Sequence, residues 1–206
     1  RLIASAQEAR IRLADGRVDP YPPVRGGRRT IGLDGRKDRL AYRSAPLGLI
    51  DRARFGDLRL TAGLPSGEDL TYSLTLWFTG RTLAYDLNGP AYIINGDAGD
   101  RVTSDPRPVE RDFAFLDELE TLPWFAGASR KVRAAVVVKL IRIHLFDAIL
   151  ARTGSNESLL THREDLLALV RRFGGLAPGV QRLLSIADRA VIDRLARPDS
   201  TSEEIM

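Results

Sequence analysis

The sequence predicts an α+β protein with an antiparallel β meander in the N-terminal half, packed with a C-terminal helical bundle. The chain has 206 residues, 44% of them hydrophobic, which is enough for a substantial core. Alternation of period two is concentrated before residue 105, and long apolar segments with helical spacing follow it. We therefore divide the chain into an N-terminal amphipathic helix (1–17), a Pro/Gly-rich basic arm or loop region (18–57), an antiparallel β region (58–105), a helical region (109–197) and a polar, frayed tail (198–206).

The first two parts differ in where proline and glycine, which interrupt helices and strands, occur. Leu2, Ala6 and Leu13 recur at helical spacing before Gly16, which predicts a short helix that ends at this glycine. From Val18 to Gly35 the chain is rich in proline and glycine, which neither a helix nor a central strand tolerates. This stretch is expected to be a loop or an extended arm.

The β region carries the strongest alternation. Leu70–Thr79 alternates apolar and polar residues and is rich in threonine, so it predicts a strand. Leu83–Leu87 and Ala91–Ile94 predict two more, and the Asn-Gly pairs that follow each of them are typical of tight hairpin turns. Another strand is expected at Leu58–Thr61.

The helical region begins after a predicted seam at Asp105–Pro108, because each proline disfavours helical geometry in the residue before it. Ser129–Arg152 predicts a long, buried helix that Ser129 caps. Thr161 and Glu164 match a capping box for the next helix. Pro178 is expected to open the last one.

The net charge of +4 comes through arginine, since lysine occurs only at positions 37, 131 and 139. Guanidinium groups pair well with phosphates and carboxylates, although codon usage in a GC-rich genome explains the same composition. The candidate residues for contact with nucleic acid or a partner protein are Arg25, Arg28, Arg29, Arg36, Lys37, Arg39, Arg43, Arg182 and Arg189.

The sequence contains few residues that could form a metal or cofactor site. The chain has no cysteine, which excludes disulfides, iron–sulfur clusters and thiolate zinc sites. His144 with Asp147 and His162 with Asp165 are spaced i, i+3, but two ligands do not make a site. The loop Asn95–Asp100 offers oxygen ligands without the spacing of an EF-hand, and a solvated hairpin turn is the preferred interpretation.

Catalytic fingerprints are also absent from the sequence. It has no Gly-x-Ser-x-Gly elbow, phosphate-binding loop or dinucleotide fingerprint. We therefore assign no catalytic, metal or cofactor-binding residue and no cofactor, and we expect a protein that is not an enzyme. An enzyme with a site built from dispersed residues is a third alternative. No apolar run is long enough to predict a transmembrane span, and the sequence does not define the compartment.

The function predicted from these observations is a non-enzymatic structural or assembly subunit, acting through protein–protein surfaces in a larger complex such as a particle, a virion or a shell. The partners expected are other protein subunits, because a Pro/Gly-rich arm suits reaching a neighbour. The alternative is a nucleic-acid-binding protein that uses the basic arm. In that case Glu164–Phe173 and Pro178–Leu195 would form a helix-turn-helix.

Overall fold

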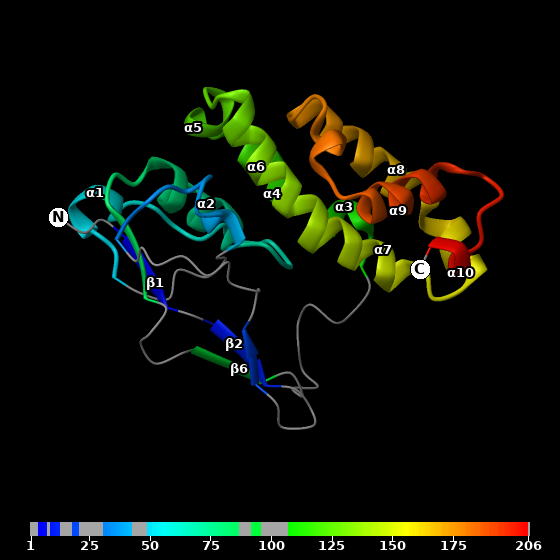
Figure 1. Cartoon of the computed structure of the whole chain (residues 1–206), viewed down its shortest axis with the longest axis horizontal. Helices are drawn as coiled ribbons and strands as arrows, with labels where there is room; N and C mark the ends of the chain where they lie inside the picture. The colour runs from blue at the N-terminus through cyan, green and yellow to red at the C-terminus, as the bar shows by residue number, and fades with distance from the viewer. Residues whose placement is uncertain are drawn as a thin grey trace. The chain divides into compact units, whose positions relative to one another are not determined.

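The computed structural model divides the chain into two compact units, Arg1–Ser104 (unit 1) and Asp105–Met206 (unit 2). The fold combines short strands in unit 1 with helices in both units, and helices predominate (Figure 1). The boundary lies at the Asp-Pro-Arg-Pro segment. The structure describes residues 4–7, 9–12, 18–20, 31–42, 49–86, 92–95 and 107–205.

Unit 1 is organised by two stretches of chain that run parallel to each other. β1 (Ala4–Gln7) pairs with β5 (Leu83–Asp86), and β2 (Ala9–Arg12) pairs with β6 (Tyr92–Asn95). Both pairs are parallel, so residues 4–7 run alongside residues 83–86 in one sheet, and residues 9–12 run alongside residues 92–95 in the other. The predicted N-terminal helix is therefore wrong for the described residues of this segment, which form strands.

Two further strands complete the sheets on their antiparallel sides. β4 (Ile31–Leu33) lies against β5, and β3 (Val18–Pro20) lies against β2. The orders are thus β1-β5-β4 and β3-β2-β6. The predicted meander is wrong, because β5 and β6 belong to different sheets. The Asn-Gly signals could not reveal this pairing, which joins positions as distant in sequence as Ala4 and Leu83.

Helix α2 (Leu70–Thr79) occupies the segment that gave the clearest strand signal. Its buried residues include Leu70, Leu74 and Trp77, which are spaced as on one face of a helix. Ser73 and Leu76 are buried as well, so most of the circumference of α2 is covered. A pattern with apolar residues at every second position is compatible with a helix when nearly all of its faces are buried.

The threonines of α2 explain how a segment of high β propensity forms a helix. The Thr75 hydroxyl donates to the Thr71 carbonyl, and the Thr79 hydroxyl donates to the Thr75 carbonyl, both at 2.7 Å. Bonds to the carbonyl four residues earlier satisfy these hydroxyls inside the helix. Tertiary burial has overridden local propensity in this segment.

The C-terminal end of α2 packs against the turn after β4. Trp77 forms a buried cluster with Leu40 and Leu83, beside the partly buried Leu33. Gly35, in the turn, approaches the backbone of Trp77 so closely that a Cβ there would overlap the Trp77 carbonyl oxygen. This contact needs glycine for its small size.

The remaining described parts of unit 1 are short. The 3-10 helix η1 (Leu40–Tyr42) follows the turn, and α1 (Arg52–Phe55) is capped by Asp51, whose carboxylate accepts from the Ala53 amide at 3.0 Å. Leu58–Thr61 leads into an irregular loop, so the strand predicted there is wrong.

Unit 2 is helical over most of its described residues. A long rod in its middle comprises α6 (Arg130–Leu140), a π-helical segment η2 (Ile141–Leu145) and α7 (Phe146–Arg152). The predicted helix over Ser129–Arg152 is confirmed, including its cap, because the Ser129 hydroxyl accepts from the Val132 amide. The other helices are α3 (Val109–Asp112), α4 (Phe115–Thr121), α5 (Pro123–Ala126), α8 (Asn156–Leu176), η3 (Val180–Leu183, 3-10), α9 (Ile186–Ala196) and α10 (Ser202–Ile205).

Two predicted helix starts in this unit need correction. Helix α8 begins at Asn156 with Ser155 as its cap, so the capping box placed at Thr161 is wrong. Ser155 lies directly after Gly154 and starts the helix well before the predicted position. The last long helix begins after Ser185, which forms a capping box with Asp188, and not at Pro178.

The tail was predicted to be frayed, but its described residues, 198–205, are ordered. Ile205 is buried, and the Ser202 amide donates to the Asn156 side chain at 2.8 Å. An apolar anchor and a bond to the start of α8 thus hold the end of the described chain.

A charge network joins the start of unit 2 to the end of the rod. Arg152, whose side chain is 3% exposed, donates to the Asp112 carboxylate, and Arg107 donates to the other oxygen of Asp112 at 3.0 Å. Arg152 also donates to the Arg107 carbonyl. One carboxylate thus contacts two guanidinium groups in a largely buried place.

Gly35→Ala should destabilise unit 1 by about 2 kcal/mol or more, because the added methyl group must displace backbone rather than a flexible side chain. Trp77 reports on this unit in a Trp124→Phe background, so urea unfolding followed by fluorescence measures the loss. Gly174→Ala in unit 2, followed through Trp124 in a Trp77→Phe background, is the control, since a methyl group at this position of α8 would meet nothing within 4 Å. An unchanged midpoint for Gly35→Ala would contradict the packing described.

Asp112→Ala should cost about 3 kcal/mol, because it leaves the buried Arg152 without its carboxylate. Glu164→Ala is the matched control: it breaks the pair with Arg171, in which the Arg171 and Glu164 side chains are 63% and 79% exposed. That change should stay within about 0.5 kcal/mol. Chemical denaturation of both variants tests the contrast, and equal losses would show that burial does not set the strength of these pairs.

Candidate functional site

A candidate site in unit 1 lies where the loop before α2 meets the helix. The Thr61 amide donates to the Glu68 carbonyl at 3.0 Å, and the hydroxyls of Thr61 and Thr71 lie 3.0 Å apart. Gly63 and Gly67 have φ values of +80° and +78°, which favour glycine. These contacts close the loop between Thr61 and Thr71, and they fix Glu68 and Asp69 at the start of α2.

Asp69 differs from its neighbours in its position and its burial. It occupies the N-cap position of α2, yet its carboxylate makes no capping hydrogen bond. Its side chain is partly buried, whereas Glu68 is exposed. The amino end of a helix carries partial positive charge and favours a carboxylate there. Asp69 is therefore a carboxylate that the fold holds in place and does not use to cap the helix.

The basic residues predicted as contacts are only partly gathered. Arg36, Lys37 and Arg39 lie together on the turn that Gly35 anchors against α2. Asp34 accepts from the Arg36 and Lys37 amides at 3.1 and 2.7 Å, so a carboxylate lies within this basic turn.

The other predicted contacts are separate from this turn. Arg182 is exposed on η3, and Arg189 lies on α9, where it donates to the Leu184 carbonyl at 3.0 Å. Arg25, Arg28, Arg29 and Arg43 lie outside the described residues.

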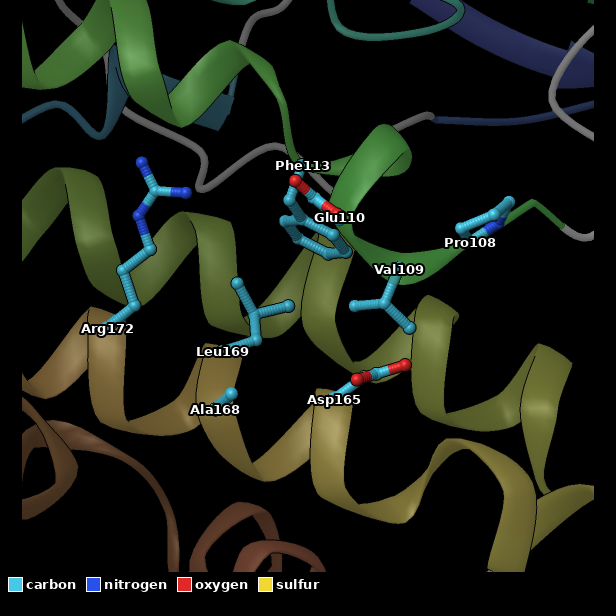
Figure 2. Close-up of a pocket in the computed structure, with 8 residues that line it drawn as sticks. All are labelled: Pro108, Val109, Glu110, Phe113, Asp165, Ala168, Leu169 and Arg172. Atoms are coloured by element: carbon cyan, nitrogen blue, oxygen red, sulfur yellow. The ribbon is translucent and has the colours of Figure 1, made fainter.

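Unit 2 contains a groove of about 250 Å³ between α3 and α8. Figure 2 shows Val109, Glu110 and Phe113 on one side and residues of α8 on the other. Val109 and Phe113 are each only 3% exposed, so the groove offers little apolar surface. Its basic residue, Arg172, is already bonded to Asp117 and Glu120 at 2.6 and 2.7 Å.

A buried polar pair lies in the rod of unit 2. Lys139 is 1% exposed, and its Nζ lies 2.7 Å from Nε2 of His144. Because a lysine ammonium only donates, Nε2 accepts and the imidazole is neutral. Burial and the neighbouring Lys139 hold the pKa of His144 well below its usual value. Burial also raises the pKa of Asp147, the residue paired with His144 in the sequence analysis.

The π-helical segment explains how residues five apart can bond. In an α-helix, positions i and i+5 are rotated by about 140° from each other. The wider i→i+5 turn of η2 brings Lys139 and His144 to the same side.

Metal ligands do not gather in the part of the chain that is described. No group of three His, Asp or Glu side chains there is placed to hold an ion. Asn95 ends β6, and the rest of the predicted Asn95–Asp100 loop lies outside the described residues. Within the described ranges, no helix has the length and apolar character to cross a membrane.

The sequence analysis missed Asp69 and Lys139. Gly67-Glu68-Asp69 before an apolar run is a signal for a helix start, but the alternation after it favoured a strand. Lys139 lies in a strongly apolar helix, where a single charge predicts burial with a partner.

Comparison with known proteins gives a likeness in fold alone. No protein-family model matches the sequence, and no curated protein matches it. The crystal structure of S. aureus TarS residues 1–349 in complex with UDP-GlcNAc is similar, with a TM-score of 0.63 at 11% sequence identity. The match covers 98% of this chain and 56% of the TarS chain, so this chain spans about half of that protein's solved length.

This likeness contradicts the leading function predicted from the sequence, which was a structural or assembly subunit. Nucleic-acid binding, the alternative, stays a prediction. The fold resembles one in which a solved protein holds a nucleotide sugar. The prediction failed because it took missing motifs as a sign that the protein acts only through its surfaces. A fold can carry a site made of dispersed residues that no short motif marks.

The stability of unit 2 should depend on pH through His144. Its folded pKa lies below the value of about 6.5 expected when unfolded, so acid favours the unfolded state. The stability that the neutral His144 gives to unit 2 is fully present above about pH 7. Below about pH 6.5 the free energy of unfolding decreases, by up to about 1.4 kcal/mol per pH unit. Urea unfolding at about pH 7 and about pH 5.5, on either side of this range, followed by Trp124 fluorescence in a Trp77→Phe background, measures it.

His144→Gln keeps an acceptor for Lys139 but cannot titrate, so it should reduce this pH dependence. His162→Gln is the control and should leave the dependence in place. If His144→Gln and the parent lose equal stability between the two pH values, another group is responsible.

Proposed function

We propose that this chain forms part of a protein that binds a nucleotide sugar and transfers its glycosyl group to an acceptor hydroxyl. The single observation that carries the proposal is the likeness in fold to TarS in complex with UDP-GlcNAc over 98% of this chain. Because the likeness extends across both units, it concerns the whole architecture and not one small supersecondary motif.

The chemistry of such a transfer defines what the protein must supply. The bond between the anomeric carbon and the diphosphate oxygen breaks, and the nucleoside diphosphate leaves with the electron pair. The acceptor oxygen forms a new bond to the anomeric carbon, and its proton passes to a base. A carboxylate held near the acceptor hydroxyl is suited to this role.

Asp69 is the best candidate for that base among the unit 1 carboxylates whose side chains are described. It is partly buried and stands at the start of α2, in a position that the loop before it fixes. Asp51 is also partly buried, but it precedes α1, a helix of four residues, whereas Asp69 precedes the ten-residue α2. The remaining ones are exposed: Asp34, Asp38, Asp57 and Glu68.

The test uses the intact gene product with UDP-GlcNAc and other nucleotide sugars, which carry GDP, ADP or dTDP. Calorimetry measures binding, and release of the nucleoside diphosphate measures transfer to water or an added acceptor. Asp69→Asn should leave the dissociation constant within about twofold and lower the release rate about 100-fold or more, which is typical of losing a general base. Asp57→Asn, an exposed carboxylate of the same unit, should change neither.

Absence of binding to every nucleotide sugar would overturn the proposal as a whole. Binding with an unchanged release rate in Asp69→Asn would retain the nucleotide-sugar site and remove Asp69 from the role of base.

A further inference from the structure

The exposed surface where η3 and α6 meet has an unusual combination of apolar and basic side chains. Leu183 and Ile186 are 59% and 80% exposed, although each is a large aliphatic residue. They lie on either side of the short connection between η3 and α9, so they are close neighbours in the chain. Their exposure is not required by the packing of unit 2.

Exposed basic residues lie at the start of α6, the helix against which η3 packs. η3 packs against α6, and Arg130, the first residue of α6, donates to the Pro178 carbonyl just before η3. Arg130, Lys131 and Arg182 are all exposed. We call the five residues Arg130, Lys131, Arg182, Leu183 and Ile186 the η3–α6 surface. In Figure 1 the start of α6 and the connection from α8 to α9 lie at the same end of the unit 2 helices.

The two segments that build this surface contain no acidic residue. Positions 121–146 and 166–187 lack both Asp and Glu, whereas acids are frequent in the rest of unit 2. The first acid after the second segment is Asp188. Its carboxylate is bonded to Arg142 at 3.0 Å and to the Ser185 amide at 3.1 Å, so its charge is balanced within the fold.

A second pair of exposed aliphatic residues in the same unit shows the contrast. Leu150 and Leu160 are 55% and 69% exposed. Asp147 lies one turn before Leu150, and Glu157 and Glu164 lie one turn before and after Leu160. Among the described residues of unit 2, large exposed aliphatic side chains therefore occur both among acids and in a basic setting without acids.

We propose that the η3–α6 surface docks unit 2 onto an anionic lipid bilayer. Aliphatic side chains that project from a basic surface insert between headgroups, while Lys and Arg approach the negative lipid phosphates. An acidic polymer would bind the basic side chains of this surface but would leave Leu183 and Ile186 exposed to water. A protein partner would need a broader apolar face than two aliphatic side chains provide. The proposal does not depend on the proposed transfer from a nucleotide sugar.

Vesicle co-sedimentation tests the proposal with the full chain. Vesicles of phosphatidylcholine alone are compared with vesicles in which about a third of the lipid is phosphatidylglycerol, at low and at physiological salt. The chain should sediment with the anionic vesicles, and binding should weaken as salt rises because screening shortens the reach of the charges.

Leu183→Ser with Ile186→Ser should lower the partition coefficient about tenfold or more. Lys131→Gln with Arg182→Gln should lower it about tenfold and flatten its salt dependence. Leu150→Ser with Leu160→Ser is the matched control and should leave binding unchanged. All of these residues are exposed, and circular dichroism checks that each variant is folded.

Three results would overturn the proposal. The first is no sedimentation with anionic vesicles at low salt, and the second is an equal loss in the Leu150 and Leu160 variant. The third is self-association in light scattering that the Leu183 and Ile186 variant abolishes while vesicle binding is absent, which would assign this surface to a second copy of the chain.

Discussion

Unit 1 depends on the burial of helix α2. Its ten residues pack their apolar side chains on most sides, and the unit's buried cluster forms around Trp77, near its C-terminal end. The turn at Gly35 and strand β5 at Leu83 both close onto that end, while the irregular loop at Thr61 closes onto the other. Because both ends are fixed in this way, the residues just before α2 are held in place as well. The position of Asp69 follows from this burial.

The helical part of the fold was predictable from local signals, and the strand part was not. The rod of unit 2 is marked by its length, by its continuous apolar character and by the cap at Ser129, all of which lie within one segment. The sheets of unit 1 instead join residues 4–7 to residues 83–86 and residues 9–12 to residues 92–95. No local pattern encodes such a pairing. In α2, burial overrides the β propensity of threonine, and the Thr75 and Thr79 hydroxyls are satisfied by bonds within the helix.

The candidate site was harder to predict than the fold, for a related reason. The basic residues that drew attention in the sequence are numerous, but only Arg36, Lys37 and Arg39 of the described ones share a turn in unit 1, and Asp34 lies within that turn. Asp69 matters through its partial burial and its fixed position at the start of α2. Neither property can be read from residue type or spacing, because both depend on how the loop at Gly63 and Gly67 folds back.

Charge in unit 2 divides into groups that the fold uses internally and groups that it leaves exposed. The buried cations have partners inside the fold: Arg152 bonds to Asp112, and Lys139 bonds to the neutral imidazole of His144. Because these two residues are buried, they do not contribute to the charge of the protein surface. The excess of arginine in the composition is therefore a poor guide to where the protein meets its ligands. The charges that remain on the surface are more informative, and the acid-free segments around η3 and the start of α6 keep their cations exposed. A composition becomes a functional argument only when the structure shows which charges are already used within the fold.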